Sequence, residues 1–202
     1  MATLEIVQVG DPVLRQTTRT LTREELASPE IQTLIVDMRD TMRAAPGVGL
    51  AAPQIGRSLA LAVIEDPPEY QAKMTAEERA ERERAAVPFH VIVNPVLTPI
   101  GDDQVEHFEG CLSFNGFNMI VARARRVRVE ALDEHGTPRV IEASGWYARI
   151  LQHEIDHLNG IVCCDRMQSR TLTTAANYSK HWGAKSIEAT KAALGQSPTG
   201  RR

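Results

Sequence analysis

The chain has 202 residues, of which 43% are hydrophobic and 24% are charged, the balance of an ordinary globular protein with a sizeable core. Its formal net charge of −3 gives no electrostatic reason to expect nucleic acid as the main partner. No apolar run reaches the roughly 18 residues that a membrane-spanning helix needs, so the sequence predicts no membrane segment.

The N-terminal half predicts a strand, a helix and a glycine-rich turn. A short strand over residues 4–9 ends at a Gly-Asp-Pro turn. A helix is expected over residues 28–44, with Ser28 as its N-cap and Pro29 at its first position. Residues 45–56, "APGVGLAAPQIG", contain three glycines and two prolines, so they predict a loop or tight turn whose backbone closely approaches another group.

The middle of the chain alternates strands with one charged segment. Residues 66–88 are rich in charge and poor in large apolar groups, which predicts a solvated surface insertion with at most a short helix. Period-two patterns predict strands at residues 59–64, 91–93, 104–108, 118–121, 127–132 and 139–143. Near the strand at residues 127–132, arginines alternate with apolar residues, which favours the solvated side of a strand over a nucleic-acid patch. These arginines are Arg123, Arg125, Arg126 and Arg128.

The C-terminal part predicts two helices. Residues 146–159 form the first, which Gly160 would end. The second is expected at about residues 177–194, within a C-terminal segment (171–194) packed on a single catalytic domain (1–170) and followed by a flexible tail (195–202). Because strands outnumber helices and are joined locally, we expect an α+β fold with mainly antiparallel pairing.

The stretch "RILQHEIDHLNG", residues 149–160, places His153 and His157 four residues apart with Glu154 directly after the first. On a helix, four residues advance about 400°, so both imidazoles lie on one face, one turn apart. This spacing suits two nitrogen ligands of one metal ion, with Glu154 close enough to handle a proton. The same pattern also occurs on ordinary helix surfaces, and two ligands do not complete a site.

Three residues are candidates for the third ligand. Cys163 follows the spacing of metzincin proteases, Glu188 would be a distant acid, and Cys111 lies upstream in "EGCLS" (109–113). Each choice predicts a different protein. His153 and His157 with Cys163 would suit a metalloprotease, whereas all four Cys and His side chains together would form a closed structural zinc site. Cysteine is also a common small core residue, so the residues alone leave the choice open.

Three motifs occur in one order: "GVGLAAPQIG" (47–56), "EGCLS" (109–113) and "QHEIDHLNG" (152–160). Together they resemble the motifs of the peptide deformylase family, and the resemblance runs from about residue 5 to 165. It implies a fold of antiparallel sheets around a central metal-binding helix. It also implies hydrolytic removal of the formyl group from the N-terminal formylmethionine of newly synthesised polypeptides, with the metal held by Cys111, His153 and His157.

The resemblance also implies how the reaction proceeds. Three protein ligands leave one position for water, and a divalent metal there lowers the pKa of that water toward 7. Glu154 would act as general base toward the water and as general acid toward the departing amine. The oxyanion would be stabilised by the side-chain amide of Gln54 and the backbone N–H of Leu112. From the residues alone, Gln54 would be an ordinary surface-loop residue. The family implies Fe²⁺, with Zn²⁺, Ni²⁺ or Co²⁺ as alternatives.

Further positions follow from the same resemblance. The peptide would add to a sheet edge at Val48, Gly49 and Gly110, with Ile150 lining the methionine pocket. Supporting charges around the metal would be Glu109, Arg123 and Asp156. The implied partners are N-formylmethionyl peptides, nascent chains and, transiently, the ribosome. The first residues resemble neither a signal peptide nor a transit peptide, and Cys111, Cys163 and Cys164 form no disulfide framework, so we expect a cytoplasmic enzyme.

The sequence departs from the family pattern directly after "EGCLS". Phe114-Asn115 replaces the usual pair of a small apolar residue and proline, and Asn118 stands where many deformylases carry a substrate-contacting arginine. The metal ligands and Glu154 are unaffected, so we expect the chemistry to be retained. Substrate affinity and inhibitor sensitivity are the properties that these departures would change, as in an additional, divergent copy of a bacterial enzyme.

Overall fold

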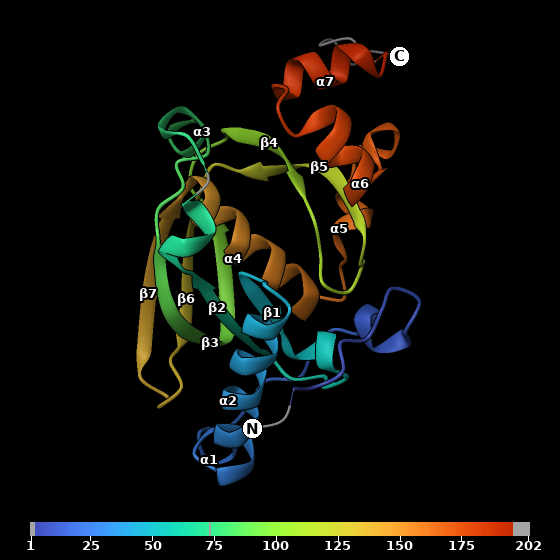
Figure 1. Cartoon of the computed structure of the whole chain (residues 1–202). Helices are drawn as coiled ribbons and strands as arrows, with labels where there is room; N and C mark the ends of the chain where they lie inside the picture. Colours follow the sequence, from blue (N-terminus) through green and yellow to red (C-terminus); the bar gives the residue numbers. More distant parts are fainter. Residues whose placement is uncertain (1–2, 73, 196–202) are drawn as a thin grey trace.

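The computed structural model describes residues 3–72 and 74–195, and this part of the chain forms eight strands in two antiparallel sheets (Figure 1). The five-stranded sheet has the order β1 (Gly49–Ala51), β2 (Leu61–Asp66), β3 (Val87–Pro99), β6 (Arg126–Leu132), β7 (Pro138–Ser144). The three-stranded sheet has the order β4 (Gln104–Glu109), β5 (Phe117–Ala124), β8 (Thr173–Thr174). All neighbouring strands are antiparallel, as the α+β prediction requires.

Helices lie between and around the sheets. The α-helices are α1 (Arg23–Leu26), α2 (Pro29–Ala44), α3 (Ala76–Glu81), α4 (Gly145–Leu158), α5 (Cys163–Arg166), α6 (Ala175–Asn177) and α7 (Ile187–Ala193). Short 3₁₀ turns occupy Pro12–Arg15, Ala52–Ile55, Pro68–Gln71 and Ser169–Thr171, and a π-turn occupies Tyr178–Trp182. None of the described helices is long and apolar enough to cross a membrane.

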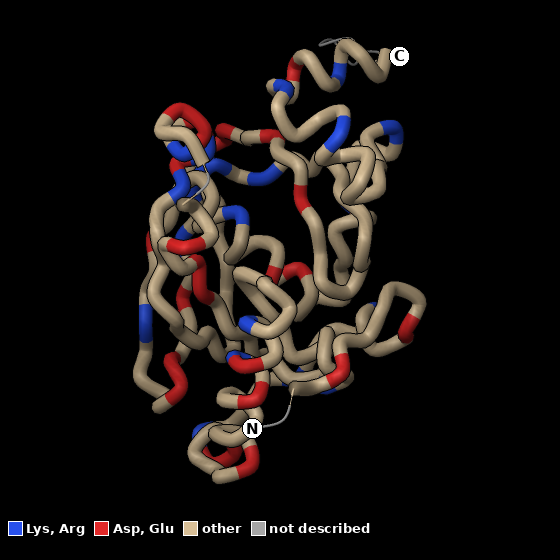
Figure 2. Tube along the Cα trace, in the orientation of Figure 1, with Lys and Arg blue, Asp and Glu red and all other residues tan. Residues whose placement is uncertain are grey.

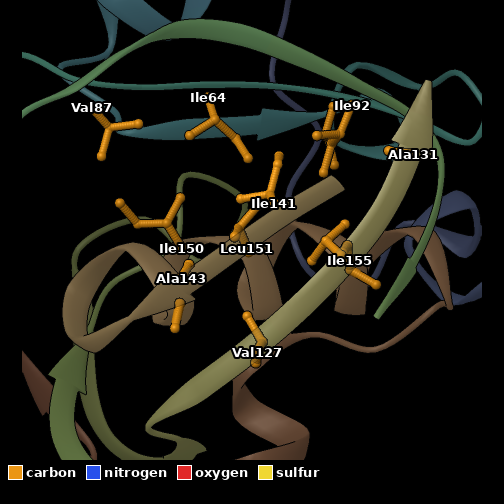
Figure 3. Close-up of a cluster of buried hydrophobic side chains, with 14 of the residues drawn as sticks. Ile64, Val87, Ile92, Val127, Ala131, Ile141, Ala143, Ile150, Leu151 and Ile155 are labelled. Carbon is orange, nitrogen blue, oxygen red and sulfur yellow. The ribbon is translucent and has the colours of Figure 1, made fainter. Parts of the chain in front are cut away.

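Helix α4 runs through the middle of the molecule, and its apolar face packs against the five-stranded sheet (Figure 1). Figure 3 shows the resulting core, in which Ile150, Leu151 and Ile155 of α4 lie among side chains from the sheet. Those sheet residues are Ile64, Val87, Ile92, Val127, Ala131, Ile141 and Ala143. Full burial of each large aliphatic side chain stabilises the fold by about 1.5–3 kcal/mol, so this packing fixes α4 and everything it carries.

The ends of both long helices agree with the prediction. The Ser28 hydroxyl accepts a hydrogen bond from the Ile31 N–H at 3.3 Å, which caps α2, and Pro29 is its first residue. Helix α4 ends at Leu158, and Gly160 adopts φ +73°, the left-handed conformation expected after a helix C-terminus.

Two predicted elements are wrong. Residues 4–9 form no strand; instead the Val7 N–H donates to Gln54 O at 2.9 Å and the Val9 N–H donates to Ser113 O at 2.7 Å. The single helix predicted at 177–194 is divided into α6, the π-turn and α7. Helical structure ends near Gly183 and begins again after Ser186, the N-cap of α7. Of the predicted tail, residues 195–202, only Gly195 lies within the described residues.

The charged insertion is anchored more firmly than its composition predicted. It does contain a short helix, α3, with no buried residue. At its beginning, however, the Asp66 carboxylate is fully buried in an ion pair with Arg84, with Nε–Oδ2 and Nη2–Oδ1 distances of 2.8 Å. Its end at Val87 belongs to β3. The segment is therefore a fixed part of the fold at both ends.

Candidate active site

The two histidines of α4 lie beside Cys111, which follows β4 in the connection to β5. One ligand atom from each of Cys111, His153 and His157 lies within 4.8 Å of the others. The Sγ atom of Cys111 is 3.3 Å from Nε2 of His157, close to the roughly 3.5 Å expected between a sulfur and a nitrogen bound to one tetrahedral ion. The soft thiolate and two imidazoles therefore suit Fe²⁺ or Zn²⁺.

The other two candidates for the third ligand lie elsewhere. Cys163 is buried at the start of α5 and packs in the same cluster as Cys111, but it does not belong to the three-residue group described above. Glu188 is exposed on α7. Contact with the Cys163 thiol and burial both raise the pKa of the Cys111 thiol. A cation at this position would reverse that effect and hold Cys111 as a thiolate.

Glu109 orients His153. Its buried carboxylate lies 3.1 Å from Nδ1 of His153 and accepts hydrogen bonds from Arg123 (2.9 and 3.0 Å) and Arg149 (2.6 Å). Burial opposes ionisation of Glu109, but His153 and Arg123 outweigh it and lower the pKa of this carboxyl. Burial also opposes the charged form of His153 and by itself would lower its pKa, but the hydrogen bond to Glu109 and the charge of Glu109 raise this pKa to about 9. The bond at Nδ1 leaves Nε2 to face a metal, the arrangement usual for metal-binding histidines.

Arg123 and Asp156 extend this network away from the metal group. Arg123 also donates to Asp156, which accepts two further bonds from Arg166 at 2.6 and 2.7 Å. Burial opposes the charge on Arg123, but Glu109 and Asp156 raise its pKa. Arg123 is only 3% exposed, so the expectation that it belongs to a solvated arginine face is wrong. Arg125 and Arg126 are exposed as expected.

The Glu154 carboxylate is buried directly against the backbone of Gly49. A Cβ atom at position 49 would lie 2.8 Å from Cγ of Glu154 and closer still to its carboxylate. Oε2 of Glu154 is buried and has no hydrogen-bond partner within residues 3–72 and 74–195. Burial raises the pKa of Glu154 to about 7, although the neighbouring His153 opposes the rise. A carboxyl group in this state can both accept and release a proton near neutral pH.

Gln54 is buried, not a surface-loop residue. Its Oε1 accepts from the Ala51 N–H at 2.8 Å, which fixes the amide plane. Its Nε2 then points to Ser113 Oγ (3.3 Å) and Cys111 Sγ (3.7 Å). Ser113 is the last residue of the "EGCLS" motif, had no predicted role of its own and is fully buried. The amide donor of Gln54 is therefore held beside the candidate metal ligands, Cys111, His153 and His157.

These groups open onto a cavity of about 600 Å³. All four expected substrate-binding positions, Val48, Gly49, Gly110 and Ile150, line it. So does Asn118, while Phe114 stacks on Phe117 with ring centroids 5.2 Å apart. Residues that the sequence did not single out also line the cavity: Arg82, Phe108, Trp146, Arg149, Ala175 and Tyr178.

Arg149 ties the site to the three-stranded sheet. Besides Glu109, its guanidinium donates to Val121 O in β5 (2.9 Å) and Val105 O in β4 (2.6 Å). It is 2% exposed. The sequence motifs predicted no role for Arg149, because its partners are distant in the chain.

A helix that presents two histidines and a buried glutamate to a cysteine, within a substrate-sized cavity, is typical of metal-dependent hydrolases. The sequence profile described as polypeptide deformylase matches residues 3–172. Peptide deformylase 3 of Streptomyces avermitilis is 45% identical over 192 residues, which cover 95% of this chain and 84% of the relative.

Solved structures agree. Peptide deformylase from Ehrlichia chaffeensis in complex with actinonin has a TM-score of 0.71 at 36% identity, covering 83% of this chain and 90% of that one. The class I type b enzyme from Acinetobacter baumannii with bound Met-Ala-Ser has a TM-score of 0.72 at 29% identity, covering 82% and 99%. The chain therefore belongs to the polypeptide deformylase family. It is a hydrolase with the activity of that family, removal of the formyl group from an N-terminal methionine.

Proposed function

We propose that this enzyme deformylates nascent polypeptides with a single divalent metal ion, Fe²⁺ in the cell, held by Cys111, His153 and His157. The observation that carries the proposal is the meeting of these three side chains beside the buried carboxylate of Glu154. When bound, the ion supplies an activated water and polarises the formyl carbonyl. Zn²⁺, Ni²⁺ or Co²⁺ would fit the same sulfur and nitrogen ligands.

Glu154 handles the proton. With a pKa raised to about 7, it takes a proton from the attacking water and returns it to the amine nitrogen as the C–N bond breaks. Its burial against Gly49 keeps bulk water from competing for that proton. As the neighbour of His153, Glu154 points about 100° away around the helix, which suits proton transfer without coordination.

Two fixed donors stabilise the oxyanion. The Gln54 amide is pre-oriented by Ala51, so no reorganisation is needed as charge develops. The Leu112 N–H follows Cys111 directly and donates to no acceptor within the described ranges 3–72 and 74–195. Each such donor typically contributes about 3–4 kcal/mol to transition-state stabilisation.

The peptide binds along β1. This strand is the outermost of its sheet, so the edge of Gly49–Ala51 that faces away from β2 pairs with no other strand of residues 3–72 and 74–195. An extended chain could pair there with the groups that remain, since Gln54 already binds the Ala51 N–H. Val48 and Gly110 flank that edge, and Ile150 offers an apolar wall to the methionine side chain. Glu109, Arg123 and Asp156 brace His153 from behind. Nascent chains are the substrates, so the enzyme works in the cytoplasm with transient access to the ribosome.

The test is an anaerobic assay on formyl-Met-Ala-Ser with metal analysis of the same samples. We expect one bound ion per chain and an activity that air destroys when the ion is Fe²⁺. Cys111→Ala should lose both metal and activity, whereas the matched variant Cys163→Ala should keep both. Glu154→Gln should keep the metal and lose about 100- to 10,000-fold in kcat.

Other outcomes would contradict the proposal. A Cys111→Ala enzyme that retains metal and activity, together with a Cys163→Ala enzyme that loses them, would indicate the metalloprotease arrangement. A metal-replete protein without any deformylase activity would indicate a closed structural site of four ligands.

A further inference from the structure

Arg82 is a charged side chain of the active-site cavity that the proposed mechanism does not use. It directly follows α3 and lines the same cavity as Cys111, His153 and Glu154. Three nearby arginines have carboxylate partners: Arg84 with Asp66, Arg125 with Glu83, and Arg149 with Glu109. Arg82 forms no ion pair with any carboxylate of residues 3–72 and 74–195.

The position of Arg82 is fixed by the beginning of α4. Its backbone carbonyl accepts from the Trp146 N–H at 2.9 Å, and its guanidinium lies over the Trp146 ring at 5.3 Å. Gly145 makes this approach possible, because a Cβ there would lie 2.7 Å from the Arg82 carbonyl oxygen. Stacking holds the plane of a guanidinium while leaving its N–H groups free to donate.

Trp146 supplies a second donor beside Arg82. Its Nε1 atom is buried and has no hydrogen-bond partner in the described part of the chain. Trp146 also lines the active-site cavity. A buried donor without a partner lowers the stability of the fold by about 1–3 kcal/mol. The indole N–H of Trp146 and the guanidinium of Arg82, which lies over its ring, would therefore favour an acceptor that carries negative charge.

Charges of both signs surround this region. Figure 2 shows Lys and Arg next to Asp and Glu around α3 and β4. Two acidic residues, Glu78 and Glu81, share a smaller neighbouring cavity with Arg82. Glu78, however, accepts from the Thr75 N–H in the α3 cap, and Glu81 is exposed. Neither neutralises Arg82 by direct contact.

We propose that Arg82 and Trp146 form a carboxylate-binding subsite that selects an acidic side chain in the two residues after formylmethionine. This proposal rests on the proposed function. Trp146 lies seven residues before His153 on α4, about 10 Å along the helix axis. An extended peptide advances about 3.3 Å per residue, so the second or third residue of the substrate reaches Arg82 from the reacting centre.

The experiment compares kcat/KM for C-terminally amidated formyl-Met-Glu-Ala and formyl-Met-Ala-Glu with their Gln counterparts. Amidation removes any terminal carboxylate. At least one glutamate peptide should be about five- to tenfold better than its Gln match, mainly through KM, and added salt should reduce the ratio. Arg82→Met, which keeps an apolar stem on Trp146, should bring the ratio to about one.

Two further variants sharpen the comparison. Arg79→Met removes one charge from the same helix, where Arg79 donates to Met74 O, and should leave the ratio as in the wild type. Trp146→Phe keeps the stacking surface but removes the indole N–H, and should lower the ratio in part. Equal rates for Glu and Gln peptides in the wild type, or a preference that persists in Arg82→Met, would overturn the subsite. Absence of turnover for every peptide in the wild type would instead overturn the proposed function.

Discussion

Gly49 shows how one residue positions the proposed catalytic base. Because Gly49 has no side chain, the Glu154 carboxylate can lie directly against its backbone, in the space that a Cβ atom at position 49 would take. The carboxylate is consequently enclosed by protein, and burial raises its pKa to about 7. A carboxyl group whose pKa lies near neutral pH is suited to transferring a proton in both directions.

Gly49→Ala should therefore impair catalysis without unfolding the protein. The new methyl group would displace the Glu154 carboxylate, and misplacement by about 1 Å costs on the order of 100-fold in rate. We expect kcat on formyl-Met-Ala-Ser to fall by about that factor while metal content stays unchanged. Gly183→Ala, where a Cβ would make ordinary contacts at 3.6 Å, is the matched control. Wild-type kcat in Gly49→Ala would show that the contact does not matter.

Glu109→Gln tests the support of His153. Removing this charge leaves Arg123 and Arg149 without their shared carboxylate and weakens the bond that orients the His153 ring. Loss of such a supporting group typically lowers metal affinity about 10- to 100-fold, which competition with a chelator would measure. Glu106→Gln on the same strand loses the partly exposed ion pair with Lys191, keeps an oxygen that can accept from Gln168, and should retain wild-type affinity. Equal affinities in both variants would contradict the role of Glu109.

At the scale of elements, the sequence predicted those helices and strands whose limits depend on residues close together in the chain. Helix α2 has the Ser28 cap, helix α4 ends before Gly160, and both have a clear apolar face, so their positions were predicted closely. Strand β3 was predicted at residues 91–93 but spans Val87–Pro99. A register shift at Asn94 (φ +50°) lets the strand continue past Pro95 to Pro99. Strand β1 was not predicted, because its residues belong to a glycine-rich segment that becomes a strand only by pairing with β2.

The same distinction applies to the site. The sequence predicted that Cys111, His153 and His157 lie together, because a helical spacing and two short motifs specify them. The contacts of Arg82, Arg149 and Ser113 could not be predicted, because their partners lie far away in the chain. The division of the C-terminal helix was also missed, since a single glycine within a helical pattern is only a weak signal.

The ion pair at the base of the charged insertion gives a prediction at this scale. Asp66→Ala leaves Arg84 partly buried without a partner and should destabilise the fold by about 3 kcal/mol. Glu65→Ala, one residue earlier in β2, breaks a pair with the half-exposed Arg43 and should cost less than about 1 kcal/mol. Urea unfolding followed by circular dichroism measures both. Similar midpoints for the two variants would mean that the insertion contributes little to stability.

At the scale of the whole molecule, the proposed metal ligands join its two sheets. Cys111 belongs to the connection within the three-stranded sheet, whereas His153 and His157 lie on the helix that packs against the five-stranded sheet. A bound ion would thus add a link between layers that otherwise meet through side-chain packing and the Arg149 and Glu109 network. Metal binding and folding should therefore be coupled.

Removal of the metal should lower the melting temperature of the whole chain. An ion present at 100 times its dissociation constant stabilises the folded state by about 2.7 kcal/mol, which corresponds to about 5–10 °C for a chain of this size. Differential scanning calorimetry before and after chelation measures the shift. Cys111→Ala should melt at the same temperature with and without chelator, and a shift of wild-type size in that variant would place the stabilising ion elsewhere.

The brevity of β1 has a further consequence for how the protein behaves at high concentration. An enzyme that receives extended chains must leave some backbone hydrogen-bonding groups unpaired, and such groups also invite other copies to stack into aggregates. Here that edge spans only three residues, all of them buried, before Pro53 and a tight turn follow. In the proposed binding mode it would align one substrate peptide, yet it is too short and too enclosed a template for copies of the enzyme to polymerise upon.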